Sequence, residues 1–267
     1  MPKSILITGA SAGLGQSTAN YFVKKGFLVF GTSRKCVSGD LKDGIHWVRL
    51  DLTNEESTLE AVSYLNSQLR SLDVLLNNAG AGMVASMCDT DRDSWRTVFE
   101  TNLFGPMQLV RRLYPLLKAA QGKVINIGSI ASEFGLPYRG AYSSVKAAFE
   151  IASESLMLEL NPMGVDVHVI QPGDFATNIN NNRVVAKDIH PDFKETHQKI
   201  HTLINQHVTD GLNPLDMAKY IHNIAVRKEA KFKTRVASPI QSLSPWLKRL
   251  LPQKVFSNLL LKHYKLK

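Results

Sequence analysis

A tyrosine and a lysine four residues apart, Tyr142 and Lys146, form a pair whose spacing could serve chemistry. They lie in the small, apolar run AYSSVKAAF, and on a helix the positions i and i+4 share one face. A phenol can hydrogen-bond a carbonyl oxygen and protonate it while a hydride adds to the carbon, and a nearby ammonium favours the ionised form of a phenol. The alternative is the solvated edge of an ordinary helix, which is the default interpretation of such a pair taken alone.

A glycine-rich loop, TGASAGLG at residues 8–15, follows the first apolar run. Gly9 permits a tight turn, Gly13 lets the backbone approach a pyrophosphate, and Gly15 lets a following helix pack against the strand. The N-terminus of that helix would offer unpaired N–H groups and a partial positive charge to phosphates. The spacing Gly-x-x-x-Gly-x-Gly differs from the commonest dinucleotide fingerprint, and no Gly-Lys-Ser/Thr makes it a P-loop. A loop that serves only as a tight turn is the alternative to a dinucleotide site.

The elements that would position these groups alternate between strands and helices. Apolar, β-branched runs predict buried strands at 4–10, 26–33, 46–52, 73–80, 122–130 and 165–173. Helical periodicity predicts helices at 15–26, 54–69, about 93–119 and about 141–160. This alternation predicts one α/β domain of the Rossmann type, with a doubly wound parallel sheet covered by helices on both faces. Ligands of such sheets bind at the carboxyl ends of the strands, where each unusual cluster of this sequence falls.

The ordered set of motifs resembles the short-chain dehydrogenase/reductase family over residues 1 to about 228. The motifs are Thr8-Gly9-x-x-x-Gly13-x-Gly15, Asn77-Asn78-Ala79-Gly80, Ser129, Tyr142-x-x-x-Lys146 and Pro172-Gly173. Each motif alone is weak or moderate, but the set is specific. The stretch SIASEFGLPYRGAYSSVKAAFE most resembles members related to steroid and retinol dehydrogenases.

The resemblance implies roles for individual residues. Tyr142 would be the general acid/base, Lys146 would assist it and hold the nicotinamide ribose, and Ser129 would donate to the substrate oxygen. Asn102 would hold a water in a proton relay with Lys146, and Asp51 would flank the adenine. The full set of cofactor-binding residues that it implies is Gly9, Ser11, Gly13, Leu14, Gly15, Ser33, Arg34, Asp51, Leu52, Asn78, Ala79, Gly80, Tyr142, Lys146, Pro172, Gly173 and Thr177.

The end of the second predicted strand, GTSRK, bears on which coenzyme binds. A free ribose 2′-hydroxyl needs a carboxylate here, whereas the sequence offers Ser33, Arg34 and Lys35. A guanidinium can bind a 2′-phosphate bidentately, so we predict NADP(H) rather than NAD(H). Many NADP-using relatives carry a base just before the second loop glycine, where this chain has Ala12, and Arg34 pointing only into solvent is the alternative.

Composition and charge exclude several classes of protein. With 44% hydrophobic residues the chain can bury a core, but no apolar run approaches the roughly 20 residues of a membrane span. No secretory signal precedes the first strand, and Cys36 and Cys88 read as reduced thiols, so we expect a cytoplasmic protein. No acid follows Glu229, while nine Lys and Arg residues do, and the 23 bases before them balance the 23 acids. The body is therefore neutral, which argues against nucleic-acid binding on its folded face.

The segment that follows Gly173 bears on the substrate. Residues 174–213 would form a lid over a pocket shaped by Phe134, Leu136, Tyr138 and Phe175, which suggests a hydrophobic carbonyl or alcohol substrate. His197 and His201 are i, i+4 in this lid, but nothing completes a metal site and we expect none. We divide the chain into a catalytic domain, residues 1–230, and a basic amphipathic tail, residues 231–267.

The tail has two apolar stripes with basic residues largely outside them. The stripes are Trp246, Leu247, Leu250 and Leu251, then Val255, Phe256, Leu259 and Leu260. Packing over the substrate cleft or against a second subunit of a homo-oligomer is favoured slightly over docking on an anionic membrane surface. For the whole protein, an oxidoreductase is favoured over a non-catalytic NADPH-binding regulator on the same fold, because such regulators usually lose the tyrosine or the lysine.

Overall fold

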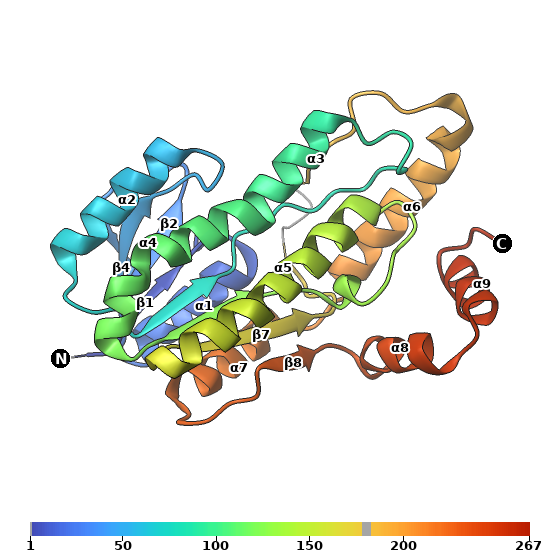
Figure 1. Ribbon diagram of the computed structural model, residues 1–267. Helices are drawn as coiled ribbons and strands as arrows, with labels where there is room; N and C mark the ends of the chain where they lie inside the picture. The colour runs from blue at the N-terminus through green and yellow to red at the C-terminus, as the bar shows by residue number, and fades with distance from the viewer. Residues whose placement is uncertain (1, 178–182) are drawn as a thin grey trace.

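A mostly parallel sheet of eight strands runs through the computed structural model, which describes residues 2–177 and 183–267 (Figure 1). The strand order is β3-β4-β2-β1-β5-β6-β7-β8, and only β3 pairs antiparallel, with β4. The strands are β1 (Ser4–Ile7), β2 (Leu28–Ser33), β3 (Leu41–Lys42), β4 (Ile45–Arg49), β5 (Val74–Asn77), β6 (Lys123–Ile127), β7 (Asp166–Pro172) and β8 (Lys233–Val236). The predicted α/β fold is confirmed, and β3 and β8 add to the six predicted strands.

Helices cover both faces of the sheet because successive strand side chains point to opposite sides. Ile5 and Ile7 lie in the core beneath α1 (Gly13–Lys24) and α7 (Pro214–Val226). Leu6, between them, lies in the core beneath α2 (Glu55–Gln68), α4 (Gly105–Ala120) and α5 (Gly140–Leu160). The strands therefore read as continuous apolar runs rather than alternating ones.

The predicted helix at about 93–119 is interrupted in the structure. It consists of α3 (Arg92–Phe99), a π-helical turn over Glu100–Phe104, and α4. Asp91 caps α3, since its carboxylate accepts from the Ser94 N–H at 2.6 Å. The π-turn carries Asn102, and such turns are frequent at functional sites.

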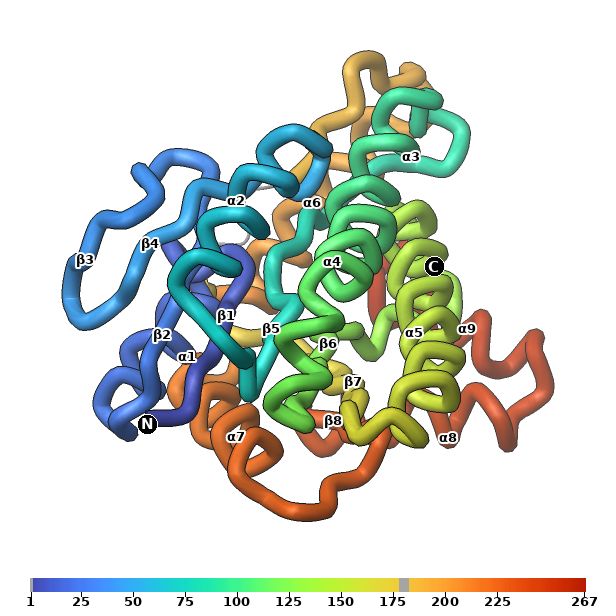
Figure 2. The backbone as a smooth tube through the Cα atoms, turned by 60° about the vertical axis from the view of Figure 1, so that its left-hand side comes forward, coloured from blue at the N-terminus to red at the C-terminus, as the bar shows by residue number. Residues whose placement is uncertain are grey.

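The chain after β7 adds α6 (Pro191–Thr209) beside the loops that follow β5 and β6, α7 on one face of the sheet, and the edge strand β8. The helix α6 buries Ile200 and Ile204 against Val84 and Tyr264. After β8, the helices α8 (Pro239–Leu250) and α9 (Gln253–His263) extend to one side of the body (Figures 1 and 2). Residues 178–182 of the predicted lid lie outside the described residues. Within the described part of the chain, no helix combines the length and apolarity needed to cross a bilayer.

Candidate active site

The glycine loop forms a tight bend between β1 and α1. Gly9 and Gly13 have φ values of +67° and +55°, in the left-handed region where residues with a Cβ are strained. A Cβ on Gly15 would lie 2.3 Å from the Gly9 carbonyl oxygen, so the helix could not approach the strand with any side chain there. The N-cap of α1, Ala12, makes no side-chain cap hydrogen bond, which leaves the N–H groups of the first turn for a ligand. The loop thus has the cradle that a dinucleotide requires.

Thr8 fastens this loop to the segment that follows β5. Its hydroxyl oxygen accepts from the N–H groups of Asn78 and Ala79, each at 2.9 Å. The Asn78 side-chain amide donates back to the Thr8 carbonyl oxygen at 2.8 Å. Two loops distant in the sequence are therefore held as one rigid wall at the carboxyl edge of the sheet.

Basic side chains stand at the end of β2. Arg34 and Lys35 are exposed and border the cleft, and the Lys35 N–H donates to the Ser33 hydroxyl at 3.2 Å. Among the described residues, neither Arg34 nor Lys35 forms an ion pair with a carboxylate. The Asp51 carboxylate accepts hydrogen bonds from the N–H and the hydroxyl of Thr53, at 3.0 and 2.8 Å. The cations at this end of the cleft are therefore available to an anionic ligand.

Tyr142 and Lys146 stand one turn apart on α5, as their spacing requires. The Lys146 ammonium lies 5.9 Å from the centre of the Tyr142 ring and donates to the Ile127 carbonyl oxygen at 2.8 Å. Lys146 is buried, and this burial lowers the pKa of its ammonium, although Tyr142 and Glu150 nearby act in the opposite direction. The lysine is therefore a fixed, desolvated cation beside the phenol rather than a solvated one.

Asn102 and Ser129 complete the polar end of the cleft. The Asn102 amide donates to the carbonyl oxygens of Val98 and Ala81, at 2.8 and 2.9 Å. Its Oδ1 atom is buried without a hydrogen-bond partner among the described residues. A Cβ placed on Gly80 would lie 2.8 Å from this Oδ1 and 3.7 Å from the Lys146 Nζ, so both atoms border one small space. A buried acceptor without a partner calls for a donor such as a water.

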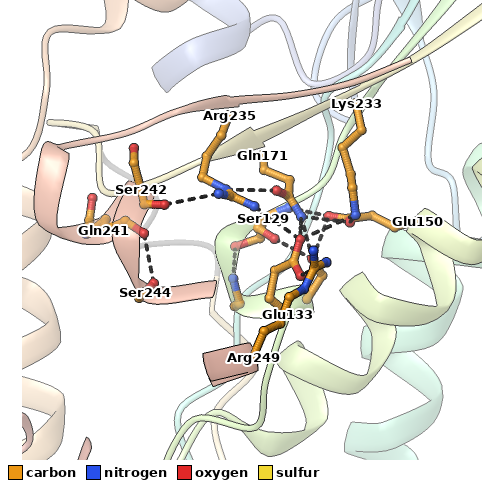
Figure 3. Close-up of polar contacts among 12 residues, drawn as sticks. Ser129, Glu133, Glu150, Gln171, Lys233, Arg235, Gln241, Ser242, Ser244 and Arg249 are labelled. Atoms are coloured by element: carbon orange, nitrogen blue, oxygen red, sulfur yellow. Dashed lines mark hydrogen bonds and ion pairs between the residues drawn. The ribbon is translucent and has the colours of Figure 1, made fainter. Parts of the chain in front are cut away.

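Behind Ser129 lies a buried polar network that the sequence analysis did not predict (Figure 3). The Ser129 N–H and the Ser132 hydroxyl donate to the Glu150 carboxylate, at 3.3 and 2.7 Å. The Gln171 amide donates to both Glu150 and Glu133, each at 2.8 Å. The one signal that could have found it is Glu150 itself, an acid in the otherwise apolar run AAFEIA.

The same network ties the C-terminal segment to the body. Lys233 and Arg235 of β8 reach Glu133 at 3.3 Å, and Arg249 of α8 lies 3.7 Å from it. Burial opposes ionisation of Glu133, but the Gln171 hydrogen bond and the two β8 cations outweigh it and hold the pKa of this carboxyl below its ordinary value. The strand β8 and helix α8 are thus attached to the body through a carboxylate that stands four residues after Ser129 in the same loop.

Most of these groups line one cleft, which has a cavity volume of about 990 Å³. Of the predicted site residues, those that line it are Gly9, Ser11, Gly13, Leu14, Ser33, Arg34, Asp51, Leu52, Asn78, Ala79, Gly80, Asn102, Ser129, Tyr142, Lys146, Pro172, Gly173 and Thr177. Gly15 does not line it, because it is buried beneath the loop. Among the predicted pocket residues, Phe134, Leu136 and Phe175 line the cleft, whereas Tyr138 packs beside Ile200 and Tyr264 instead.

Further lining residues come from segments without a recognisable motif. Arg139, Asp174 and Arg183 add charge near Tyr142, and the Arg139 guanidinium lies 5.2 Å from the centre of the tyrosine ring. The tail adds an apolar wall of Leu247, Phe256, Leu259, Leu260 and Tyr264. The described residues hold no group of three or more His, Cys, Asp or Glu side chains arranged for a metal.

Comparisons with known proteins find related sequences and structures for this chain. The family model described as short chain dehydrogenase matches residues 3–188. A 3-ketodihydrosphingosine reductase of Bacteroides thetaiotaomicron is 35% identical over 257 residues, which cover 95% of each chain. A short-chain dehydrogenase structure from Streptomyces avermitilis aligns with a TM-score of 0.83 at 27% identity, over 99% of this chain and 97% of that one. A serine dehydrogenase structure complexed with NADP+ aligns with a TM-score of 0.74 at 25% identity, over 87% and 94%.

These names correct one expectation from the sequence. The two relatives above whose names give a substrate are named for 3-ketodihydrosphingosine and for serine, not for a steroid or retinol. The special likeness of the Tyr142 region to steroid and retinol dehydrogenases is therefore not supported. Motifs around the catalytic tyrosine report the chemistry that neighbouring members share rather than the substrate, which is set by less regular segments.

Proposed function

Because the chain belongs to the short-chain dehydrogenase family, whose members act on CH–OH groups, we propose that it uses NADP(H) to interconvert a long-chain hydrophobic ketone or aldehyde and its alcohol. One observation carries this proposal. A single cleft joins the cationic end at Arg34, the polar cluster at Tyr142 and the apolar wall from α8 and α9. The three parts match a phosphorylated coenzyme, a reacting carbonyl and an alkyl chain.

The residues around Tyr142 would have separate roles in the reaction. Bound NADPH would supply the hydride. The Tyr142 phenol would hydrogen-bond the carbonyl oxygen and give it a proton as negative charge develops there, with the Ser129 hydroxyl as a second donor. The buried Lys146 ammonium would stabilise the phenolate that remains. The unpaired Oδ1 of Asn102 would hold a water through which a proton returns from solvent.

The coenzyme preference rests on Arg34 and Lys35. Both are unpaired among the described residues and border the cleft at the end of β2, where a cofactor with a free 2′-hydroxyl would need a carboxylate. A guanidinium suits the 2′-phosphate of NADP(H). The related serine dehydrogenase, whose structure is complexed with NADP+, supports the same choice.

The substrate class rests on how polarity changes along the cleft. Charged side chains, Arg139, Asp174 and Arg183, lie at the end near Tyr142, and apolar side chains follow on α8 and α9. A molecule with a polar head beside its carbonyl and a long alkyl chain fits this order. The relative named for 3-ketodihydrosphingosine, which aligns over nearly the whole of both chains, supports a substrate of that kind over one as small as serine.

Oxidation of NADPH by purified protein tests the proposal. The panel contains a long-chain 3-keto amphiphile, a short water-soluble ketone, and serine with NADP+ in the reverse direction. We expect the highest kcat/KM for the long-chain ketone with NADPH. Equal activity with serine would contradict the substrate class, and tight NADPH binding without turnover of any ketone would favour the non-catalytic regulator instead.

A further inference from the structure

The outer face of α8 exposes an apolar stripe to solvent. Ile240, Leu243, Trp246 and Leu250 are spaced three, three and four residues apart, so they share one helix face. Their exposed fractions are 82%, 53%, 56% and 77%. Such a run of large apolar side chains on one surface is unusual for a soluble protein and marks an interaction surface.

The charged residues of the tail that holds this stripe are all basic. Lys254, Lys262 and Lys265 of the tail are exposed, and the chain carries no acid after Glu229. Because the rest of the protein is formally neutral, the excess positive charge is concentrated in the segment that holds the apolar stripe. An amphipathic helix in a tail whose charged residues are all basic fits the interface of a membrane that contains anionic lipids.

The inner side of α8 is fixed to the body, which keeps the stripe turned outward. The Gln241 amide donates to the Asp174 carboxylate at 2.6 Å. The Arg235 guanidinium donates to the Ser242 carbonyl oxygen at 3.1 Å (Figure 3). Arg249 lies beside Glu133 in the same network. The two sides of α8 therefore differ, since polar groups hold one of them and the other faces solvent.

The stripe also adjoins the cleft. Ile240 of the stripe lines it together with Gln241, Ser244 and Leu247 of α8, and Leu259 of α9 both lines it and is 47% exposed. Apolar surface therefore continues from the outside of α8 and α9 toward the apolar part of the cleft.

We propose that α8 and α9 dock on an anionic phospholipid bilayer and bring the mouth of the cleft to the membrane, so that an amphiphilic substrate enters from the lipid. Substrate entry from the lipid rests on the proposed function, whereas docking itself does not. A second copy of the chain is a poorer occupant, because a two-fold interface would set the basic residues of one tail against those of the other.

Vesicle sedimentation with matched variants tests the docking. The probes are phosphatidylcholine vesicles with and without phosphatidylglycerol. Leu250→Glu places a charge within the stripe. Leu41→Glu makes the same change at another exposed leucine, on β3 at the opposite side of the molecule (Figure 2). Neither side chain lines the cleft.

We expect the full-length protein to bind the anionic vesicles at low salt, with a blue shift of the exposed Trp246 fluorescence, and to be released at high salt. Leu250→Glu should weaken binding by about tenfold or more, while Leu41→Glu should not. Failure to bind anionic vesicles, or equal losses in both variants, would overturn the docking. A dimer that Leu250→Glu dissociates, without any vesicle binding, would assign the stripe to a second copy.

Turnover separates the docking from the proposed function. Leu250→Glu should lower the rate with a long-chain ketone embedded in vesicles and leave the rate with a short water-soluble ketone unchanged. An equal rate with the embedded ketone in Leu250→Glu and Leu41→Glu would overturn substrate entry from the lipid. Vesicle binding without reduction of any ketone would support the docking and refute the proposed function.

Discussion

Replacing Glu133 by glutamine removes the charge that attaches the C-terminal segment to the loop of Ser129. In the structure its carboxylate accepts from Gln171 at 2.8 Å and lies 3.3 Å from the cations of Lys233 and Arg235. Glutamine keeps the shape of the side chain, so the loss measures the charge rather than a cavity.

The expected cost is about 2 kcal/mol, which is typical of a hydrogen-bonded, partly buried ionic contact whose cations can still reach water. For a domain of this size, such a loss lowers Tm by about 4–8 °C. Thermal and urea denaturation at neutral pH measure the change. The matched control is Glu195→Gln, which breaks an exposed pair with Lys199 and should leave Tm unchanged.

The pH dependence gives a second check on the same residue. The pKa of Glu133 is lower in the folded state than its ordinary value of 4.5, so its ionisation stabilises the fold. That contribution is complete above the ordinary pKa and is lost as the pH falls through the lower, folded-state pKa. The difference in stability between wild type and Glu133→Gln should therefore shrink on acidification. An unchanged Tm at neutral pH, or a difference that does not vary with pH, would refute the reasoning.

Three further substitutions probe the coenzyme and catalytic ends of the cleft. Gly15→Ala would place a methyl carbon 2.3 Å from the Gly9 carbonyl oxygen, so we expect a lower Tm in thermal melting and weaker binding in an NADPH titration. Gly135→Ala is the control and should change neither, because the space around Gly135 is open. Arg34→Asp removes the phosphate partner and adds repulsion, so the ratio of kcat/KM for NADPH to that for NADH should fall; a wild-type preference for NADH would contradict the assignment of this turn. Lys146→Ala should reduce both turnover and coenzyme affinity, and a loss of turnover with unchanged affinity would limit the lysine to the proton chemistry.

The fold and the polar core of the candidate site could be predicted from local sequence. Buried parallel strands read as apolar runs, and the residues that follow them must meet at one edge of the sheet, as Gly13, Asn78 and Ser129 do. The position of Tyr142 beside Lys146 on one face of a helix follows from their spacing of four residues.

Features that depend on contacts distant in the sequence could not be predicted. Glu133 looks like a surface acid until Gln171 and the β8 cations are placed beside it. The tail shows the same limit, because its amphipathic stripes are visible in the sequence but not the direction in which each faces. In the structure Phe256 is buried, whereas Trp246 and Leu250 are exposed.

Whether Tyr142 gives the proton to the substrate is the central claim, and Tyr142→Phe tests it most directly, since it removes the hydroxyl and keeps the ring. The measurement is kcat for ketone reduction beside the Kd for NADPH from fluorescence titration. We predict a fall in kcat of about 10²–10⁴-fold with a nearly unchanged Kd. A kcat close to that of the wild type would contradict the account, because the proton would then have to come from another group.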